Sequence, residues 1–136
     1  MNPILLDTHA AVWLIDGRLG SDAANEIEAA SERDELLVSP VSAWEIALLV
    51  NKRRLTLAMG VEEYVRALFS LPGVVVAALT PSIAVAAANL PHKPPSDPID
   101  RMLIASASAY GARLVTRDRA IRNYAKTTPT LRCIVC

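Results

Sequence analysis

The amino-acid sequence predicts an α/β fold, a three-layer α/β/α sandwich in which helices cover both faces of a central, mostly parallel sheet. Short apolar segments alternate with helical segments along the 136 residues, which is the order that produces parallel sheets. The strand segments are continuous aliphatic runs, as expected for strands buried on both faces. Hydrophobic residues make up 52% of the chain and aromatic residues only 4%. We therefore expect an aliphatic core in a single domain over residues 1–136.

The first part of the chain contains the first two predicted strands. An aliphatic strand over residues 4–6 is followed by a short helix over residues 8–15. A second helix begins at Ser21, since serine is a favoured N-cap residue. The second strand covers residues 36–38 and leads into a helix over about residues 41–52, which ends in basic side chains, the favoured charge at a helix C-terminus.

The remainder of the chain continues this alternation and ends in a strand. The further predicted elements are helix 61–70, strand 74–79, helix 82–89, helix 98–110, strand 113–116, helix 118–124 and strand 131–135. The helix from residue 98 has two clear boundary signals. Pro98 suits the first helical position after Asp97, and Gly111 suits the position after the helix ends.

Charge is unevenly distributed, although the formal net charge is zero. Residues 1–50 carry two basic and nine acidic side chains, whereas residues 101–136 carry seven and one. This asymmetry predicts a basic patch near an acidic pocket, although a solvated helix face explains the charges equally well. No apolar run reaches the roughly 18 residues of a membrane span, and the first residues lack a signal-peptide pattern. We therefore expect a cytoplasmic protein without membrane contacts.

Four acidic residues follow predicted strands, either directly or in the first turn of the next helix. They are Asp7, Glu45, Asp100 and Asp118, of which Asp100 is separated from its strand by a long loop. The carboxyl ends of parallel strands meet at one edge of a sheet, where α/β proteins bind ligands. Gathered carboxylates repel one another and raise one another's pKa values, a penalty that a cation removes. An oxygen-only ligand set predicts Mg²⁺ or Mn²⁺.

Each of these acids also has a purely structural explanation. The alternatives are a helix cap for Asp7, a capping box for Ser42 and Glu45, a cap pair for Asp97 and Asp100, and an ion pair for Asp118. If these alternatives hold, the chain is a catalytically silent α/β protein-interaction module. The apolar neighbours of Glu45 predict a buried helix, and we expect Trp13 and Trp44 to pack in the core.

Four segments together resemble the PIN domain and, more narrowly, the VapC-type toxins of bacterial toxin–antitoxin pairs. They are residues 6–10 (LDTHA), 42–46 (SAWEI), 97–105 (DPIDRMLIA) and 115–118 (VTRD), and they occur in order along the whole chain. The resemblance implies an α/β/α sandwich and a Mg²⁺- or Mn²⁺-dependent endoribonuclease that hydrolyses RNA phosphodiester bonds. One departure is Ile99, where this subgroup often has an aromatic residue.

The same resemblance implies roles for individual residues. Asp7, Glu45, Asp100 and Asp118 match the catalytic, metal-binding acidic quartet, Thr116 matches the hydroxyl residue that accompanies the fourth acid, and Asp97 matches an additional acid. It also implies a homodimer and a cognate antitoxin whose tail enters the active-site groove. The basic C-terminal segment is expected to hold the RNA backbone. The candidate residues are Arg113, Arg117, Arg119 and Arg122.

Overall fold

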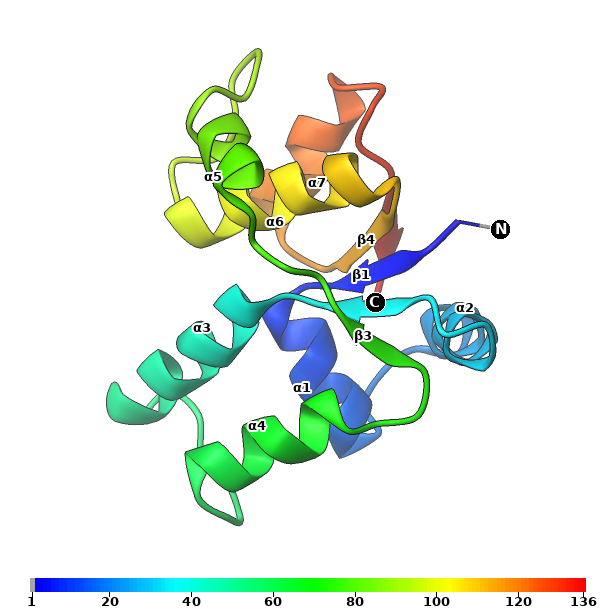
Figure 1. Cartoon of the computed structure of the whole chain (residues 1–136), viewed down its shortest axis with the longest axis vertical. Coiled ribbons are helices and arrows are strands. Elements are labelled where there is room, and N and C mark those ends of the chain that lie inside the picture. The colour runs from blue at the N-terminus through cyan, green and yellow to red at the C-terminus, as the bar shows by residue number, and fades with distance from the viewer. Residues whose placement is uncertain (1) are drawn as a thin grey trace.

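The structure is a computed structural model that describes residues 2–136 and has the predicted alternation of strands and helices (Figure 1). In chain order the elements are β1 (Ile4–Leu6), α1 (Thr8–Asp16), α2 (Ser21–Glu32), β2 (Leu36–Val38), α3 (Pro40–Asn51), α4 (Val61–Phe69), β3 (Val74–Val76), α5 (Pro81–Ala88), α6 (Pro98–Tyr110), β4 (Arg113–Thr116), α7 (Arg119–Lys126) and β5 (Cys133–Val135). No helix within residues 2–136 is both long enough and apolar enough to cross a bilayer.

All five strands are parallel and lie in the order β3-β2-β1-β4-β5. Successive side chains of the central strand point to opposite faces, as strand geometry requires. Ile4 and Leu6 pack with α1, α2 and α4, whereas Leu5 packs with α6 and α7. Figure 1 shows α1 and α4 on one side of the sheet and α5, α6 and α7 on the other. The predicted α/β/α sandwich is confirmed, and its sheet is fully parallel.

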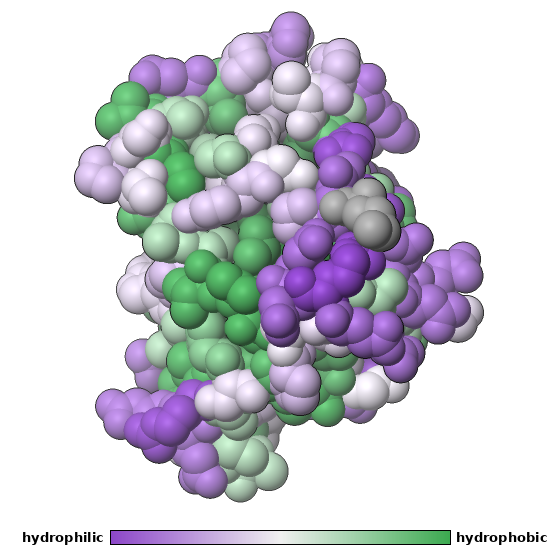
Figure 2. Space-filling model, turned by 45° about the vertical axis from the view of Figure 1, so that its right-hand side comes forward, coloured by the Kyte–Doolittle hydropathy of each residue, from purple (hydrophilic) through white to green (hydrophobic). Residues whose placement is uncertain are grey.

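Strand β3 is shorter than the strand predicted over residues 74–79. The backbone N–H of Ala77 donates to the carbonyl of Val38 at 2.9 Å, and β2 ends at this point because α3 begins. Without a partner strand, the chain beyond Ala77 continues as a connection to α5. β5 likewise begins two residues later than predicted. β3 is an edge strand, and its residues Val75 and Val76 are exposed. Apolar surface is visible in the middle of the face of the molecule drawn in Figure 2.

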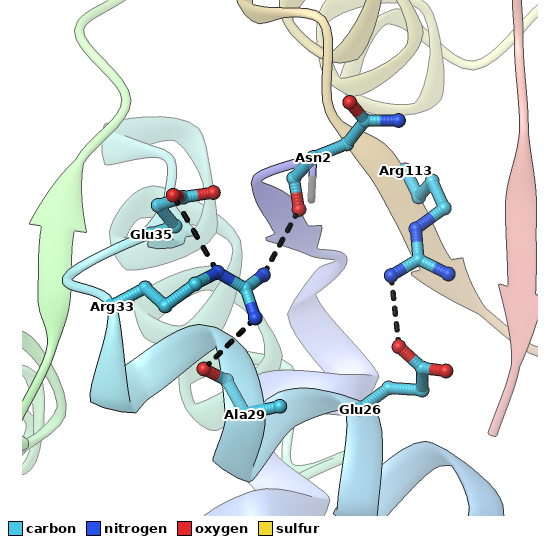
Figure 3. Close-up of polar contacts among 6 residues, drawn as sticks. All are labelled: Asn2, Glu26, Ala29, Arg33, Glu35 and Arg113. Atoms are coloured by element: carbon cyan, nitrogen blue, oxygen red, sulfur yellow. Dashed lines mark hydrogen bonds and ion pairs between the residues drawn. The ribbon is translucent and has the colours of Figure 1, made fainter.

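Polar contacts close the amino-terminal edge of the sheet (Figure 3). The Arg33 guanidinium donates to the Asn2 carbonyl at 3.4 Å and lies 3.5 Å from the Glu35 carboxylate. Arg113, the first residue of β4, forms an ion pair with Glu26 of α2 at 2.8 Å. These contacts tie α2 and the connection after it to the starts of β1 and β4. The carboxyl ends of the strands lie at the opposite edge.

Candidate functional site

Five acidic side chains gather at the carboxyl edge of the sheet. Asp7 follows β1 and Asp118 follows β4, and these neighbouring strands flank the point where the strand order reverses, the usual ligand site of open α/β sheets. With Glu45 from α3 and with Asp97 and Asp100 from the start of α6, they line a cavity of about 130 Å³. The other lining residues are Thr8, His9 and Leu103. The structure therefore brings the four predicted acids together, and the additional acid, Asp97, lies with them.

Asp7 is buried, with 5% of its surface exposed. Its Oδ1 accepts a hydrogen bond from the Ala10 N–H at 2.8 Å, so Asp7 caps α1 and also lines the acid cavity. Burial raises the pKa of this carboxyl above its ordinary value, while hydrogen bonds from Thr116 and Ala10 act in the opposite direction. The capping explanation for Asp7 is therefore correct, but it does not exclude a role in the site.

Thr116 connects two of the acids at the end of β4. It is fully buried, and its Oγ1 accepts a hydrogen bond from the Asp118 N–H at 3.0 Å. Its side chain also hydrogen-bonds to the Asp7 carboxylate. Asp118 itself caps α7, because its Oδ1 accepts from the Ile121 N–H at 2.9 Å. The alternative explanation of Asp118 as an ion-pair residue is wrong, since no ion pair within residues 2–136 includes it.

Asp100 lies in the first turn of α6 and has the clearest electrostatic signature of the site. The predicted N-cap is confirmed, since Asp97 Oδ1 accepts from the Ile99 N–H at 2.8 Å. Burial first, and then the neighbouring carboxylates, raise the pKa of Asp100 from 3.8 to about 7. In decreasing order, those neighbours are Asp118, Asp97, Glu45 and Asp7. The negative charges of these neighbours therefore repel a negative charge on Asp100, and a bound cation would relieve this repulsion.

Glu45 is not part of a capping box. α3 begins at Pro40, and its N-cap is Ser39, whose Oγ accepts from the Val41 N–H at 3.1 Å. Ser42 lies inside the helix, fully buried, and accepts a hydrogen bond from the Thr8 hydroxyl at 3.1 Å. The capping explanation for Glu45 is therefore wrong. Its half-buried side chain instead lines the acid cavity.

Helix α3 is less buried than its apolar sequence predicts. Trp44, which we expected in the core, is 57% exposed. Only Val41, Ser42 and Ile46 of this helix are buried. Trp13 of α1 is half-buried at the margin of a core cluster. The expectation that both tryptophans pack in the core is wrong for Trp44 and correct only in part for Trp13.

The four candidate RNA-binding arginines do not lie together. Arg113 starts β4, where it forms an ion pair with Glu26 (Figure 3). It therefore lies at the opposite edge of the sheet from the acids. Arg117 directly precedes Asp118, and its guanidinium lies 4.4 Å from the centre of the Trp13 ring, a cation–π contact. Arg119 is exposed at the start of α7, and Arg122 is half-buried in the same helix. Three of the four therefore lie within four residues of Asp118 in the sequence, but none of them lines the acid cavity.

The acidic side chains fit a divalent metal ion chemically. No group of three His, Cys, Asp or Glu side chains within residues 2–136 has a geometry that would hold a metal ion by itself. Mg²⁺, however, keeps several of its waters and binds through one or two carboxylates, so a loosely convergent set is compatible with it. The donors around the cavity are carboxylates and a threonine hydroxyl, with one histidine and no cysteine. This set favours Mg²⁺ or Mn²⁺ over zinc.

Comparison with known proteins agrees with the fold. A profile of the PIN domain matches residues 4–127. Ribonuclease VapC22 of Mycobacterium tuberculosis is 38% identical over 131 residues, which cover 95% of this chain and 97% of that protein. Two solved structures share the fold: VapBC2 of Rickettsia felis bound to a promoter DNA fragment (TM-score 0.69, 16% identity, 97% of each chain) and DNA-bound VapBC of Salmonella typhimurium (TM-score 0.63, 15% identity, 99% of this chain and 98% of that one). The chain belongs to the PIN domain family and, within it, to the VapC type.

Proposed function

We propose that this protein is a Mg²⁺- or Mn²⁺-dependent endoribonuclease and the toxin of a toxin–antitoxin pair. The observation that carries the proposal is the convergence of five carboxylates on one small cavity, where burial and then the four neighbouring carboxylates raise the pKa of Asp100 to about 7. Clustered carboxylates with perturbed pKa values are typical of catalytic sites. RNA as the substrate is supported by the 38% identical relative, which is a ribonuclease.

The cation is held by Asp7, Glu45, Asp100 and Asp118 in this proposal. Helix capping uses one carboxylate oxygen of Asp118, which leaves the second for the cation. Asp7 caps α1 through Oδ1 and also contacts Thr116, and a carboxylate has lone pairs beyond those two hydrogen bonds for the cation. Asp100 and Glu45 have no hydrogen-bond partner within residues 2–136 that competes for their oxygens. When bound, the cation activates water and neutralises the charge that develops on the phosphate.

The remaining residues of the site hold these groups in place or contact RNA. Thr116 fixes Asp7 and Asp118 relative to each other through its hydrogen bonds. Asp97 caps α6 and adds negative charge beside Asp100. Glu45 or Asp118 orients the attacking water. The RNA backbone is bound by Arg117, Arg119 and Arg122, whereas Arg113 takes no part because it lies at the opposite edge of the sheet.

The proposal also includes an antitoxin partner, an oligomeric state and a location in the cell. The solved structures of the same fold are VapBC complexes, so we propose a cognate VapB-type antitoxin that inhibits this chain by entering the acid cavity. We further propose that the protein is a homodimer. We also propose that it acts in the cytoplasm, where an RNA substrate is available.

The test is cleavage of structured and single-stranded RNAs by the purified protein, with Mg²⁺ or Mn²⁺, with a chelator, and with the Asp100→Asn variant. We expect cleavage that requires the metal and that falls by roughly 100-fold or more in the variant. The Asp22→Asn variant alters an exposed aspartate of α2 outside the site and should cleave normally. Failure to cleave any RNA, together with no metal binding in calorimetry, would refute the proposed ribonuclease activity and favour the alternative, a catalytically silent protein-interaction module.

A further inference from the structure

A second and larger space adjoins the acid cavity on the side of α3. It is a groove of about 530 Å³ between α3 and the start of α6, and it shares Glu45 and Asp97 with the acid cavity. Sites that enclose small organic ligands measure roughly 300–1,000 Å³. The acid cavity, at about 130 Å³, is too small for a nucleotide, whereas the groove has room for one. A nucleotide beside the scissile phosphate therefore fits in the groove.

The walls of this groove are apolar and include an exposed aromatic ring. Trp44 is 57% exposed and directly precedes Glu45 in α3. Leu48 lies one turn further along the same helix, and Ile99 and Met102 line the groove from α6. An indole surface of this kind provides a stacking platform for bases of any sequence, because every base has a π face.

The end of the groove away from the acids is basic. Lys52 follows α3, and Arg54 lies two residues further on; both line the groove. Neither forms an ion pair with any residue from 2 to 136. Because an α-helix rises 1.5 Å per residue, Lys52 lies roughly 10 Å along α3 from Glu45. The groove therefore leads from the carboxylates, past an aromatic ring, to two free cations.

We infer that this groove, which we call the Trp44 groove, binds an unpaired base that flanks the scissile phosphate of the RNA. In this arrangement the base stacks on Trp44, and the next phosphate of the strand lies near Lys52 and Arg54. The inference rests on the proposed function. RNA is favoured over a protein segment because the groove is continuous with the acid cavity and because its outer end is cationic. Single-stranded RNA is commonly recognised by stacking of splayed bases on aromatic rings.

The first test compares Trp44→Ala, Trp44→Phe and Val85→Ala in steady-state cleavage of a short single-stranded RNA. Val85 is a matched control because it is 62% exposed on α5 and does not line the groove. Loss of one stacked base should raise KM by roughly 5- to 140-fold in Trp44→Ala. kcat should change little, since the lost contact is made in ground and transition states alike. Phenylalanine should restore most of the loss.

The second test measures binding without cleavage. In a Trp13→Phe background, Trp44 is the single tryptophan, and a short single-stranded RNA oligonucleotide, kept intact by a chelator, should quench its fluorescence. The reciprocal Trp44→Phe variant, which keeps Trp13, should show much weaker quenching. No quenching of Trp44 at oligonucleotide concentrations that inhibit cleavage would overturn the inference.

The third test concerns the basic end of the groove. Each phosphate contact with single-stranded RNA contributes about 0.7 to the slope of log affinity against log salt concentration. The double variant Lys52→Ala, Arg54→Ala should therefore lower this slope by about 1.4. Arg66→Ala, which removes an exposed charge of α4 outside the groove, should not change it.

The outcomes separate this inference from the proposed function. If the native protein cleaves RNA and Trp44→Ala keeps its KM, the groove does not bind the substrate and the proposed function stands. If the native protein cleaves no RNA, the proposed function fails first. Sedimentation distinguishes a further explanation: if Trp44→Ala changes the molar mass of the protein along with KM, the groove is a contact between two copies and the inference is overturned.

Discussion

Replacing Asp100 with asparagine should stabilise the metal-free protein at pH 8 and leave its stability nearly unchanged at pH 4. The folded protein raises the pKa of Asp100 from 3.8 to about 7, mainly by burial and by the charge of Asp118. Each pKa unit corresponds to about 1.4 kcal/mol, so the full shift corresponds to about 4 kcal/mol. Asp100 remains half-buried rather than enclosed, and solvent screening reduces the expected effect to about 1–2 kcal/mol.

The sign follows from proton binding. Between pH 3.8 and about 7, folded Asp100 keeps a proton that the unfolded chain has released. The free energy of unfolding therefore falls as the pH rises through this window and is constant with respect to this group above it. Asparagine carries no ionisable proton, so the free energy of unfolding of the variant does not fall with pH on account of this residue. The gain of Asp100→Asn over the native protein should accordingly grow from pH 4 to pH 7 and then level off.

Urea unfolding in the presence of a chelator, repeated from pH 4 to pH 8, measures this gain. Asp22→Asn is the matched control, since Asp22 is exposed in the first turn of α2. It should show no gain and a loss of up to about 1 kcal/mol at pH 8, because a negative charge is favourable there. An equal free-energy difference between Asp100→Asn and the native protein at pH 4 and pH 8 would refute the convergence of charges on Asp100. Saturating Mg²⁺ should reverse the order at pH 8, adding roughly 2.7 kcal/mol to the native protein at 100 times Kd.

Three further substitutions test the site and the fold. Asp7→Asn keeps the cap to α1, because asparagine caps as well as aspartate. It should keep or raise the melting temperature of the metal-free protein, since burial raises the pKa of Asp7, while lowering the RNA cleavage rate by roughly 100-fold; cleavage at a third or more of the native rate would contradict the metal role. Thr116→Val should cost about 1 kcal/mol in urea unfolding because the partly buried hydrogen bond from the Asp118 N–H is lost, and Thr116→Ser should restore most of this loss. Gly73→Ala should lower the free energy of unfolding by about 2–6 kcal/mol, since its φ is +79° and a Cβ would lie 2.0 Å from the Ser31 carbonyl oxygen. Gly111→Ala is the control: its φ is +63° with open space around it, so it should lower the free energy of unfolding by only about 1–2 kcal/mol. Equal losses in the two variants would show that the contact with Ser31 does not matter.

The fold was predictable because its signals are local. The central strands are uninterrupted aliphatic runs, and the observed strands at Ile4–Leu6 and Leu36–Val38 match the predicted ranges. The boundaries of the helix Pro98–Tyr110, with proline at its first position and glycine after its end, were also correct. The end of β3 was missed because it depends on where the neighbouring strand ends, and no residue of β3 itself carries that information.

The gathering of the acids was predictable from topology, whereas their surroundings were not. Any residue that follows a parallel strand reaches the same edge, which correctly brought Asp7 and Asp118 together. The same rule, applied to the first residue of β4, would have placed Arg113 at the opposite edge. The signal for the true cap of α3 was also available, because Pro40 at the first helical position identifies Ser39 as the N-cap.

The exposure of Trp44 is the clearest case that local sequence could not decide. Its neighbours in the sequence are apolar and resemble those of a buried helix. Its exposure instead depends on where α6 begins, about fifty residues further along the chain, and on the groove left between α6 and α3. The continuity of this groove with the acid cavity is likewise a property of the three-dimensional arrangement alone.

The most direct test of the central claim is a crystal structure with Mn²⁺, in which the anomalous signal of the metal locates it independently of the protein atoms. We predict a peak inside the cavity lined by Asp7, Glu45, Asp100 and Asp118, with carboxylate oxygens as its protein ligands, and the loss of this peak in Asp100→Asn. The absence of a peak in this cavity, in crystals of a protein that cleaves RNA with Mn²⁺, would contradict the assignment of these acids as the metal site.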